Sequence, residues 1–499
     1  MPVSITPTEP PESAGPADSA AQADAPALRL YDSAARAIVP LAPTATPGLV
    51  TIYLCGATVQ GSPHIGHMRS GIAFDVLRRW LERCGQEVRL IRNVTDIDDK
   101  MIQRAHSEGI EVSDLAARFI GEYYKDADAL GIRRADVAPL ATEHMPEIIG
   151  TIERIIERGH AYASDGDVYF DVRSWPRYGE LSGQKVDEMA AAEDADPRGK
   201  RDPRDFALWK GRKPEEPVTA SWPTPWGRGR PGWHLECSAM SGKYLGDTFD
   251  IHGGGIDLRF PHHENELAQS AGAGRGFARV WMHNAWVTMA GEKMSKSLGN
   301  TALVSEVTKA FDPRAVRFFL LAPHYRSQIE FSPADEQTRG SLAEAEKGIE
   351  RIDSFLASAG ERGLTRGRVG GPFWEAFEAA MNDDLATPTA VATLFEAVRA
   401  GNKALSDGDP GAADLYATVA EMTSILGINP ADAPWATATG GDDLTPVVDR
   451  LVSTLLEQRS EARAAKDWGR ADAIRDTLTE AGLSITDTPE GARWSLEKK

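Results

Sequence analysis

Apolar and polar positions follow two alternating periods from Leu49 onward. The run Leu49–Leu54 is rich in β-branched residues and predicts a strand, whereas His64–Arg83 repeats apolar residues at a helical period. Glu87–Ile91 then predicts a second strand. Strand, turn, helix and strand in this order form the βαβ unit of a parallel, doubly wound sheet.

The same pattern returns after a long interruption. It predicts a helix at 233–244, the end of a strand at 249–252, a helix at 262–271 and a strand at 280–289. We therefore expect an α/β fold: a Rossmann-type parallel catalytic sheet that an insertion splits into two halves.

Composition changes divide the remainder of the chain. Residues 197–231 hold nine Lys or Arg against four Asp or Glu, with three tryptophans, and predict an inserted lobe that is either a solvated linker or a contact surface for RNA or substrate. Helical patterns follow at 332–359, 373–407, 411–426 and 447–481, and a small hairpin is expected at 483–496. The predicted division is a disordered tail (1–27), the first sheet half (28–139), a connective insertion (140–231), the second sheet half (232–312), a helical bundle (313–430) and a small C-terminal domain (445–499).

Composition and charge narrow the class of protein. The chain has 499 residues and a net charge of −19, which argues against non-specific adhesion to nucleic acid or anionic membranes. Three cysteines are too few for a secreted disulfide framework, and no run approaches the roughly 20 apolar residues of a membrane span. Since residues 1–27 also lack the features of a signal peptide, we expect a soluble, cytoplasmic protein with no membrane partner.

Two short motifs are suited to binding a polyphosphate. His64-Ile-Gly-His67 lies where the first strand turns into a helix, and a helix N-terminus with its backbone N–H groups attracts phosphate. Lys293-Met-Ser-Lys296 lies in a polar loop after a predicted strand, where two lysines can reach one polyphosphate. Together they predict an ATP site at the end of a parallel sheet.

A third set contains candidate metal ligands. Cys55 ends the first strand, Cys237 lies in a later helix, and His262 and Glu266 lie at positions i and i+4 of the helix that follows. Two thiols, an imidazole and a carboxylate are credible zinc ligands. The residue pattern leaves His263, Glu264, His234 and His252 open as competing ligands, and Cys84 is expected to be inert packing.

At this point the chain resembles the cysteinyl-tRNA synthetase family of class I aminoacyl-tRNA synthetases from about Leu28 to Lys499. The resemblance rests on strings that occur in family order: YLCGATV at 53–59, HIGH at 64–67, NVTDIDDK at 93–100, DFALWK at 205–210, RPGWHLEC at 230–237, HGGGIDL at 252–258, PHHENELAQ at 261–269 and KMSKS at 293–297. Gln60–Pro63 departs from the family pattern and leaves the contacts of these residues open.

The resemblance implies a cysteine–tRNA ligase that forms cysteinyl-adenylate from L-cysteine and ATP and charges tRNA(Cys). It implies one zinc ion per chain, Mg²⁺ accompanying ATP and a monomer, with 313–430 contacting the tRNA stem and 445–499 reading the anticodon. The positions that match family residues are Cys55, Cys237, His262 and Glu266 for zinc, Thr58, Thr95, Trp233, His252 and Asp257 for the cysteine and adenylate pockets, and His64, His67, Lys293 and Lys296 for ATP and catalysis.

Three other functions would use some of the same motifs. A ligase that joins cysteine to an amino sugar is expected to lack the last segment, so Arg459–Leu496 argues against it. An inactive tRNA-binding descendant is disfavoured by the intact motifs. A zinc hydrolase is disfavoured because Glu266 is used as a ligand and no general base beside it is evident.

Overall fold

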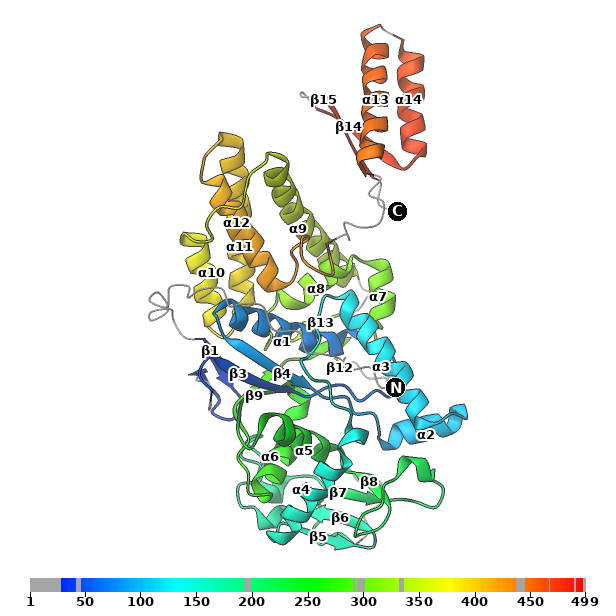
Figure 1. Ribbon diagram of the computed structural model, residues 1–499, viewed down its shortest axis with the longest axis vertical. Helices are drawn as coiled ribbons and strands as arrows, with labels where there is room; N and C mark the ends of the chain where they lie inside the picture. The colour runs from blue at the N-terminus through cyan, green and yellow to red at the C-terminus, as the bar shows by residue number, and fades with distance from the viewer. Residues whose placement is uncertain are drawn as a thin grey trace, which may run out of the picture. The chain divides into compact units, whose positions relative to one another are not determined.

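A parallel four-stranded sheet forms the centre of the first part of the chain in the computed structural model (Figure 1). The strands lie in the order β10-β9-β3-β4, and all neighbouring pairs are parallel. Their bounds are β3 (Leu49–Leu54), β4 (Glu87–Arg92), β9 (Phe249–Gly255) and β10 (Ala278–Asn284). The predicted parallel sheet in two sequence halves is confirmed.

The structure describes residues 28–41, 46–192, 199–289, 292–293, 301–331, 336–436, 445–465, 467–488 and 491–496. They form two units, residues 1–435 and 436–499, which we describe separately. The tail that we expected to be disordered, residues 1–27, lies outside the described residues.

Helices cover the sheet because each has one apolar face. Helix α1 (Ile65–Arg83) connects β3 to β4 and buries Ile72, Phe74 and Leu77 in a core shared with the helical region further along the chain. A second core, around Tyr53 and Phe249, packs the helices that surround the predicted site. Those helices are α2 (Asp99–Glu108), α3 (Val112–Ala129), α5 (Trp233–Leu245) and α6 (His262–Gly272).

The insertion contains its own antiparallel sheet in the order β5-β6-β7-β8. Trp209 is fully buried there and belongs to the core of the insertion, whereas Trp222 and Trp226 are half-buried against the same core. The elements are α4 (Met145–Glu157), β5 (Ala161–Ser164), β6 (Asp167–Phe170), β7 (Phe206–Gly211) and β8 (Gly229–Pro231).

The segment predicted as one strand at 280–289 is two strands. The backbone N–H of Ala285 donates to the carbonyl of Tyr325 (2.8 Å), so the chain leaves the parallel sheet after β10. It then forms the centre of a separate three-stranded sheet, β12-β11-β13. These strands are β11 (Val287–Met289), β12 (Glu292–Lys293) and β13 (Ile329–Glu330).

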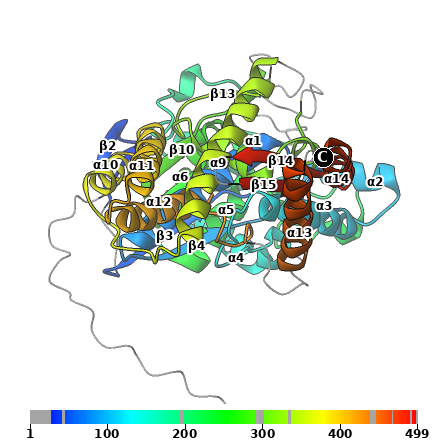
Figure 2. The same ribbon diagram turned by 90° about the horizontal axis from the view of Figure 1, so that it is seen from above.

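The helices between residues 336 and 426 pack against one another in the last part of this unit (Figures 1 and 2). The helix predicted at 373–407 is broken where Asp384 and Leu385 adopt positive φ angles of 57° and 50°. The carboxylate of Asp384 accepts a hydrogen bond from the backbone N–H of Tyr31 (2.8 Å), which holds this break in place. The region comprises α7 (Val304–Ala310), α8 (Pro313–Leu321), α9 (Glu336–Glu361), α10 (Pro372–Asn382), α11 (Thr387–Asp407) and α12 (Ala412–Leu426).

The second unit consists of two helices and the predicted hairpin, β14 (Leu483–Thr488) with β15 (Gly491–Leu496). The single helical segment expected at 447–481 is divided into α13 (Thr445–Ala464) and α14 (Trp468–Glu480). Val452, Leu478 and Leu483 form its small core. In neither unit does a described helix have the length and apolar character needed to cross a membrane.

The first unit also begins with a hairpin that the sequence pattern did not reveal. It pairs β1 (Arg29–Asp32) with β2 (Ala37–Pro40) in antiparallel register. The carboxylate of Asp32 accepts the backbone N–H of Trp281 in β10 (2.9 Å), so the hairpin is attached to the edge strand of the parallel sheet.

Candidate functional site

Four side chains from three separate segments meet at the carboxyl end of the parallel sheet. Cys55 follows β3, Cys237 lies in α5, and His262 and Glu266 lie one turn apart in α6. One potential ligand atom of each lies within 4.8 Å of the others. The sequence hypothesis that these four residues are brought together in space therefore agrees with the geometry.

The two thiols of this group have the spacing of metal ligands. The Sγ atoms of Cys55 and Cys237 are 3.7 Å apart, much farther than the roughly 2.05 Å of a disulfide. Two sulfur atoms bound tetrahedrally to one zinc ion at about 2.3 Å lie about 3.8 Å from each other. The carboxylate oxygen Oε1 of Glu266 is 3.4 Å from the sulfur of Cys55 and 3.0 Å from Nε2 of His262.

Burial makes the anionic forms of these thiols unfavourable on their own. All four side chains are buried, and desolvation raises the pKa of Cys55 well above its ordinary value and also raises that of Cys237. Desolvation likewise lowers the pKa of His262, so its imidazole is neutral and has a lone pair for a metal. A divalent cation would supply the missing positive charge, so the donor set fits a zinc ion.

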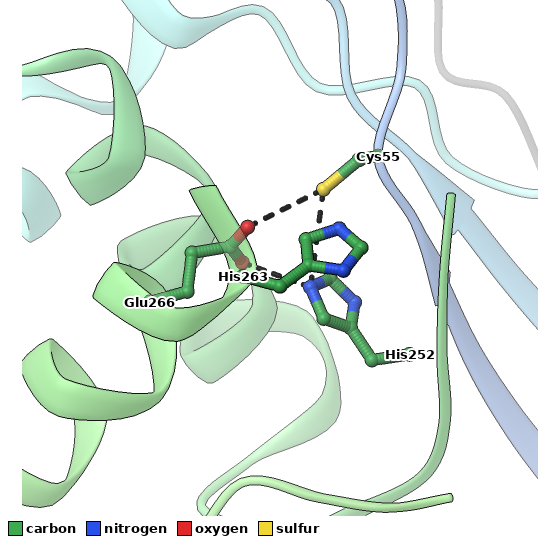
Figure 3. A group of neighbouring side chains, drawn as sticks. All are labelled: Cys55, His252, His263 and Glu266. Atoms are coloured by element: carbon green, nitrogen blue, oxygen red, sulfur yellow. Dashed lines mark hydrogen bonds and ion pairs between the residues drawn. The ribbon is translucent and has the colours of Figure 1, made fainter. Parts of the chain in front are cut away.

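His252 and His263 form a second possible ligand group with Cys55 and Glu266, whose ligand atoms also lie within 4.8 Å of one another (Figure 3). Nε2 of His252 is 2.9 Å from Oε2 of Glu266, and its Nδ1 is 3.0 Å from the carbonyl oxygen of Tyr53. Nε2 of His252 is also 3.8 Å from the sulfur of Cys55, so His252 adjoins both ligands and can orient the carboxylate, as an outer-shell partner does in metal sites.

The other competing residues have different partners. The carboxylate of Glu264 accepts the backbone N–H groups of Gly179 (2.9 Å) and Ser182 (2.7 Å) in the insertion. Nδ1 of His234 is 2.9 Å from Nδ1 of His262, and burial lowers the pKa of His234 to about 3. His234 is therefore placed to orient His262 rather than to share its ligand position. Cys84, which we expected to pack in the interior, is exposed because it caps the outer end of α1.

Some of the residues assigned to the cysteine and adenylate pockets lie next to this cluster. The ring of Trp233 is 4.2 Å from that of His262 and is 40% exposed, so it forms an accessible wall beside the ligands. Thr58 and Thr95 form a backbone bridge, and the hydroxyl of Thr95 donates to Glu236 (2.9 Å), the neighbour of Cys237. Asp257 accepts the indole N–H of Trp286 at 3.2 Å.

The two histidines of the first phosphate motif begin α1. His64 is its N-cap residue, and its backbone N–H donates to Nδ1 of His67 (3.1 Å), while the two rings lie 3.7 Å apart. Because Nδ1 of His67 accepts this bond, a neutral ring carries its proton on Nε2. Gln60–Pro63 precede this helix, and the carbonyl of Gln60 accepts a hydrogen bond from Arg104 at 2.9 Å.

Lys293 ends β12, whose backbone pairs with β11. Lys296, the second lysine of the motif, lies outside the described residues. The residues just after this stretch contact the start of α1, where Leu303 forms an antiparallel bridge with His64. The chain that follows the lysine motif thus lies beside the histidine motif.

Sequence reasoning missed residues that support the ligands from behind. Asn93 accepts the backbone N–H of Gly56 (2.8 Å), next to Cys55, and a Cβ on Gly56 would lie 1.6 Å from the carbonyl oxygen of Asn93, so only glycine fits there. His263 contacts His283 (2.8 Å between ring nitrogens), which in turn contacts Ser33. Gly56, Asn93 and His263 belong to the quoted strings, whereas His283 and Ser33 lie outside them, and only their spatial neighbours reveal their roles.

Comparison with known proteins agrees with this architecture. Residues 42–339 match the family described as tRNA synthetases class I (C) catalytic domain, residues 376–429 match the DALR domain, and residues 445–494 match the cysteinyl-tRNA ligase anticodon binding domain. Among solved structures, the methionyl-tRNA synthetase of Mycobacterium tuberculosis in complex with methionyl-adenylate has a TM-score of 0.53 at 16% identity, covering 77% of this chain and 92% of that one. At this identity the likeness concerns the fold alone.

Two curated relatives are similar over nearly their whole length. The cysteine–tRNA ligase of Cutibacterium acnes is 61% identical over 474 residues, which cover 94% of this chain and 96% of that protein. The cysteine–tRNA ligase of a Nocardioides species is 53% identical over 477 residues, covering 94% and 99%. Since the catalytic family alone spans more than half of the chain and these relatives extend through the anticodon unit, the chain belongs to the cysteine–tRNA ligase family of class I aminoacyl-tRNA synthetases.

Proposed function

We propose that this chain activates L-cysteine with ATP and transfers the cysteinyl group to the 3′ end of tRNA(Cys). The observation that carries the proposal is the pair of buried thiols 3.7 Å apart at the carboxyl end of the sheet, in a chain 61% identical to a cysteine–tRNA ligase. Parallel α/β sheets bind their ligands at this edge, so the cluster lies where a substrate would enter.

Cys55, Cys237, His262 and Glu266 would hold one zinc ion. When bound there, zinc supplies selectivity for sulfur, because a thiolate is a strong zinc ligand whereas the hydroxyl of serine stays protonated and binds poorly. Pocket shape alone discriminates changes of this size by only about 1–3 kcal/mol. Trp233, 40% exposed beside His262, would cover the amino acid, and Thr58, Thr95, His252 and Asp257 would complete the pocket.

Adenylate formation needs no protein nucleophile. The carboxylate of cysteine attacks the α-phosphorus of ATP in line, pyrophosphate leaves, and a terminal ribose hydroxyl of tRNA then takes the acyl group as AMP departs. The positive end of the α1 dipole and the Nε2 proton of His67 would stabilise the phosphate oxygens, and the ring of His64 lies 3.7 Å from that of His67. Lys293 and Lys296, with the Mg²⁺ that accompanies ATP, would neutralise the developing charge.

The remaining parts of the chain would bind tRNA. We propose that residues 313–430 contact its stem and residues 445–499 read its anticodon, which the family matches of these regions support. We also propose that the protein acts as a cytoplasmic monomer, because translation consumes charged tRNA in the cytoplasm and one chain carries all the assigned groups. Sedimentation of the purified protein with and without tRNA tests the monomer.

Exchange of radiolabelled pyrophosphate into ATP tests the first step. We expect zinc-loaded protein to catalyse exchange with cysteine and without tRNA, and to give at least about 100-fold less with serine, since a sulfur-selective site exceeds what shape provides. Absence of cysteine-dependent exchange would reject adenylate chemistry. A second assay offers purified tRNA or an amino sugar as acceptor; transfer to the amino sugar alone would favour the alternative ligase.

A further inference from the structure

Arg69 of α1 is a buried guanidinium whose hydrogen bonds to the described residues all go to backbone carbonyl groups. It is 2% exposed, and it lies two residues after His67. Its Nη1 donates to the carbonyl of Leu320 (3.0 Å), and the two N–H groups of its Nη2 donate to those of His324 (2.8 Å) and Ser327 (2.7 Å), with the carbonyl of Tyr325 at 3.5 Å. One side chain thus holds the backbone of residues 320–327 in a single place.

Burial of the Arg69 charge costs free energy, and its partners differ from those of Arg317, another buried arginine. Arg317 is fully buried but pairs with the carboxylate of Asp75 (2.6 Å). Arg69 forms no ion pair in the described part of the chain, and desolvation lowers its pKa to about 10. A buried charge that is compensated by carbonyl dipoles alone is unfavourable for folding, which points to a role in placing the segment that it binds.

The segment held by Arg69 leads directly into the small sheet that ends at Lys293. Ser327 is followed by β13, whose Ile329 and Glu330 pair with Val287 and Thr288 of β11. Thr288 then pairs with Lys293 of β12. The carbonyl of Tyr325 in the same loop also accepts the N–H of Ala285, so the turn between β10 and β11 is anchored to this loop as well.

A second connection joins the start of α1 to the residues beyond the lysine motif. The N–H of Ile65 donates to the carbonyl of Ala302 (3.0 Å), and the N–H of Val304 donates to that of Pro63 (3.2 Å). These bonds fix the residues after the motif directly to the histidine turn. On the side before the motif, α1 packs directly against β11 and is also connected to it through Arg69 and β13.

We propose that Arg69 is a positioning residue for adenylate formation, which holds β12 and its Lys293 at the correct separation from His64 and His67 by gripping the backbone of residues 320–327. The proposal rests on the proposed function, because it assigns both motifs to the phosphates of ATP. A shift of about 1 Å between groups that stabilise a transition state is enough to slow a reaction by about 100-fold.

Replacement of Arg69 by lysine and by methionine tests this role. Lysine keeps the charge but reaches fewer carbonyl groups, whereas methionine removes the charge and keeps much of the volume. Per active site counted by adenylate burst, we expect kcat for ATP–pyrophosphate exchange to fall by about 10- to 100-fold in Arg69→Met and less in Arg69→Lys. We expect the KM for cysteine to stay within twofold, since the metal cluster does not contact this segment.

Arg317→Met is the matched control, because it removes a guanidinium that also binds carbonyl groups but does not touch the β11–β13 sheet. It should lower the Tm and leave kcat per active site within twofold. An equal loss of kcat in both variants, or an unchanged kcat in Arg69→Met, would overturn the positioning role. Absence of exchange by the unsubstituted protein would instead reject the proposed function.

A double-mutant cycle separates positioning from general destabilisation. If Arg69 acts through Lys293, the effects of Arg69→Lys and Lys293→Ala on kcat are strongly non-additive, and the double variant is no more than about threefold slower than Lys293→Ala. If the fall in kcat of the double variant equals the product of the falls in the two single variants, the proposal is contradicted, because independent sites give additive free energies.

Discussion

Two thiols separated by 182 positions in the sequence lie 3.7 Å apart, and their surroundings disfavour charge. Each thiol loses hydration on burial, which raises its pKa. The pair therefore depends on a cation to become two thiolates, and bound zinc should be lost when either sulfur is replaced. The third cysteine, Cys84, is exposed and does not belong to this buried pair.

We predict that Cys237→Ser lowers zinc affinity by more than about 100-fold, since even outer-shell partners cost 10- to 100-fold. The affinity for cysteine should fall with it, while the affinity for ATP alone changes little. Competition with a chromophoric chelator measures zinc, and equilibrium dialysis measures the amino acid. Cys84→Ser is the matched control and should retain both affinities. Equal zinc content in the two variants would remove Cys237 from the ligand set.

The sequence predicted the members of the Cys–His–Glu cluster better than it predicted the residues that contact them. Spacing placed His262 and Glu266 on one helix face, because positions i and i+4 always meet there. Nothing in the spacing could show that His234 contacts His262 while Glu264 bonds to the backbone of Gly179. Those contacts depend on how α5, α6 and the insertion pack, and packing is a property of the whole fold.

Helix α1 carries a buried ion cluster in its middle turn, in addition to its phosphate motif. Asp75 is paired with Arg317 (2.6 Å), Arg79 (2.8 Å) and Arg133 (3.1 Å). Burial alone would raise the pKa of Asp75, but the three guanidinium groups outweigh it and hold the pKa well below its usual range. The cluster joins α1 to α8, so it ties the catalytic sheet to the helical region.

We predict that Asp75→Asn destabilises the first unit by about 3–5 kcal/mol at pH 7, because it leaves Arg317 buried without its counter-ion. The folded pKa is depressed, so the stabilisation is fully present above the unfolded pKa of about 4 and is lost as the pH falls below it. Urea unfolding at pH 7, 4 and 3 should show the difference between the two proteins shrinking with pH. A difference that does not change over this range would contradict the pairing.

Elements with a regular period were predicted well, and breaks were predicted poorly. The strand at 49–54 and the helix beginning at 65 follow from alternation and from the 3.6-residue repeat. The break at Asp384 has no local signal, because its positive φ is maintained by hydrogen bonds to Tyr31 and Tyr325, which are far away in the sequence. The end of β10 likewise depends on a distant carbonyl.

At the scale of the whole molecule, the chain separates chemistry from recognition. The first unit contains every described residue assigned to cysteine, zinc or ATP, and the second has a core of its own around Val452, Leu478 and Leu483. Within 451–499, eight Lys or Arg stand against nine Asp or Glu, so net charge does not make this unit bind RNA. Its contribution must come from specific contacts, which a deletion can isolate.

We predict that removal of residues 436–499 leaves cysteine-dependent pyrophosphate exchange within about twofold and lowers kcat/KM for tRNA charging by at least 100-fold, or about 2.7 kcal/mol of binding at the transition state. The loss should appear mainly in the KM for tRNA, because the acyl-transfer groups remain in the first unit.

Trp468 is 58% exposed at the start of α14, and an exposed indole can stack on an unpaired base. Trp468→Ala should therefore reproduce part of the loss with an intact fold, at a cost of about 1–3 kcal/mol if a base stacks there. Equal charging by the truncated protein would show that the second unit does not read tRNA, whereas loss of exchange would show that it supports the first unit.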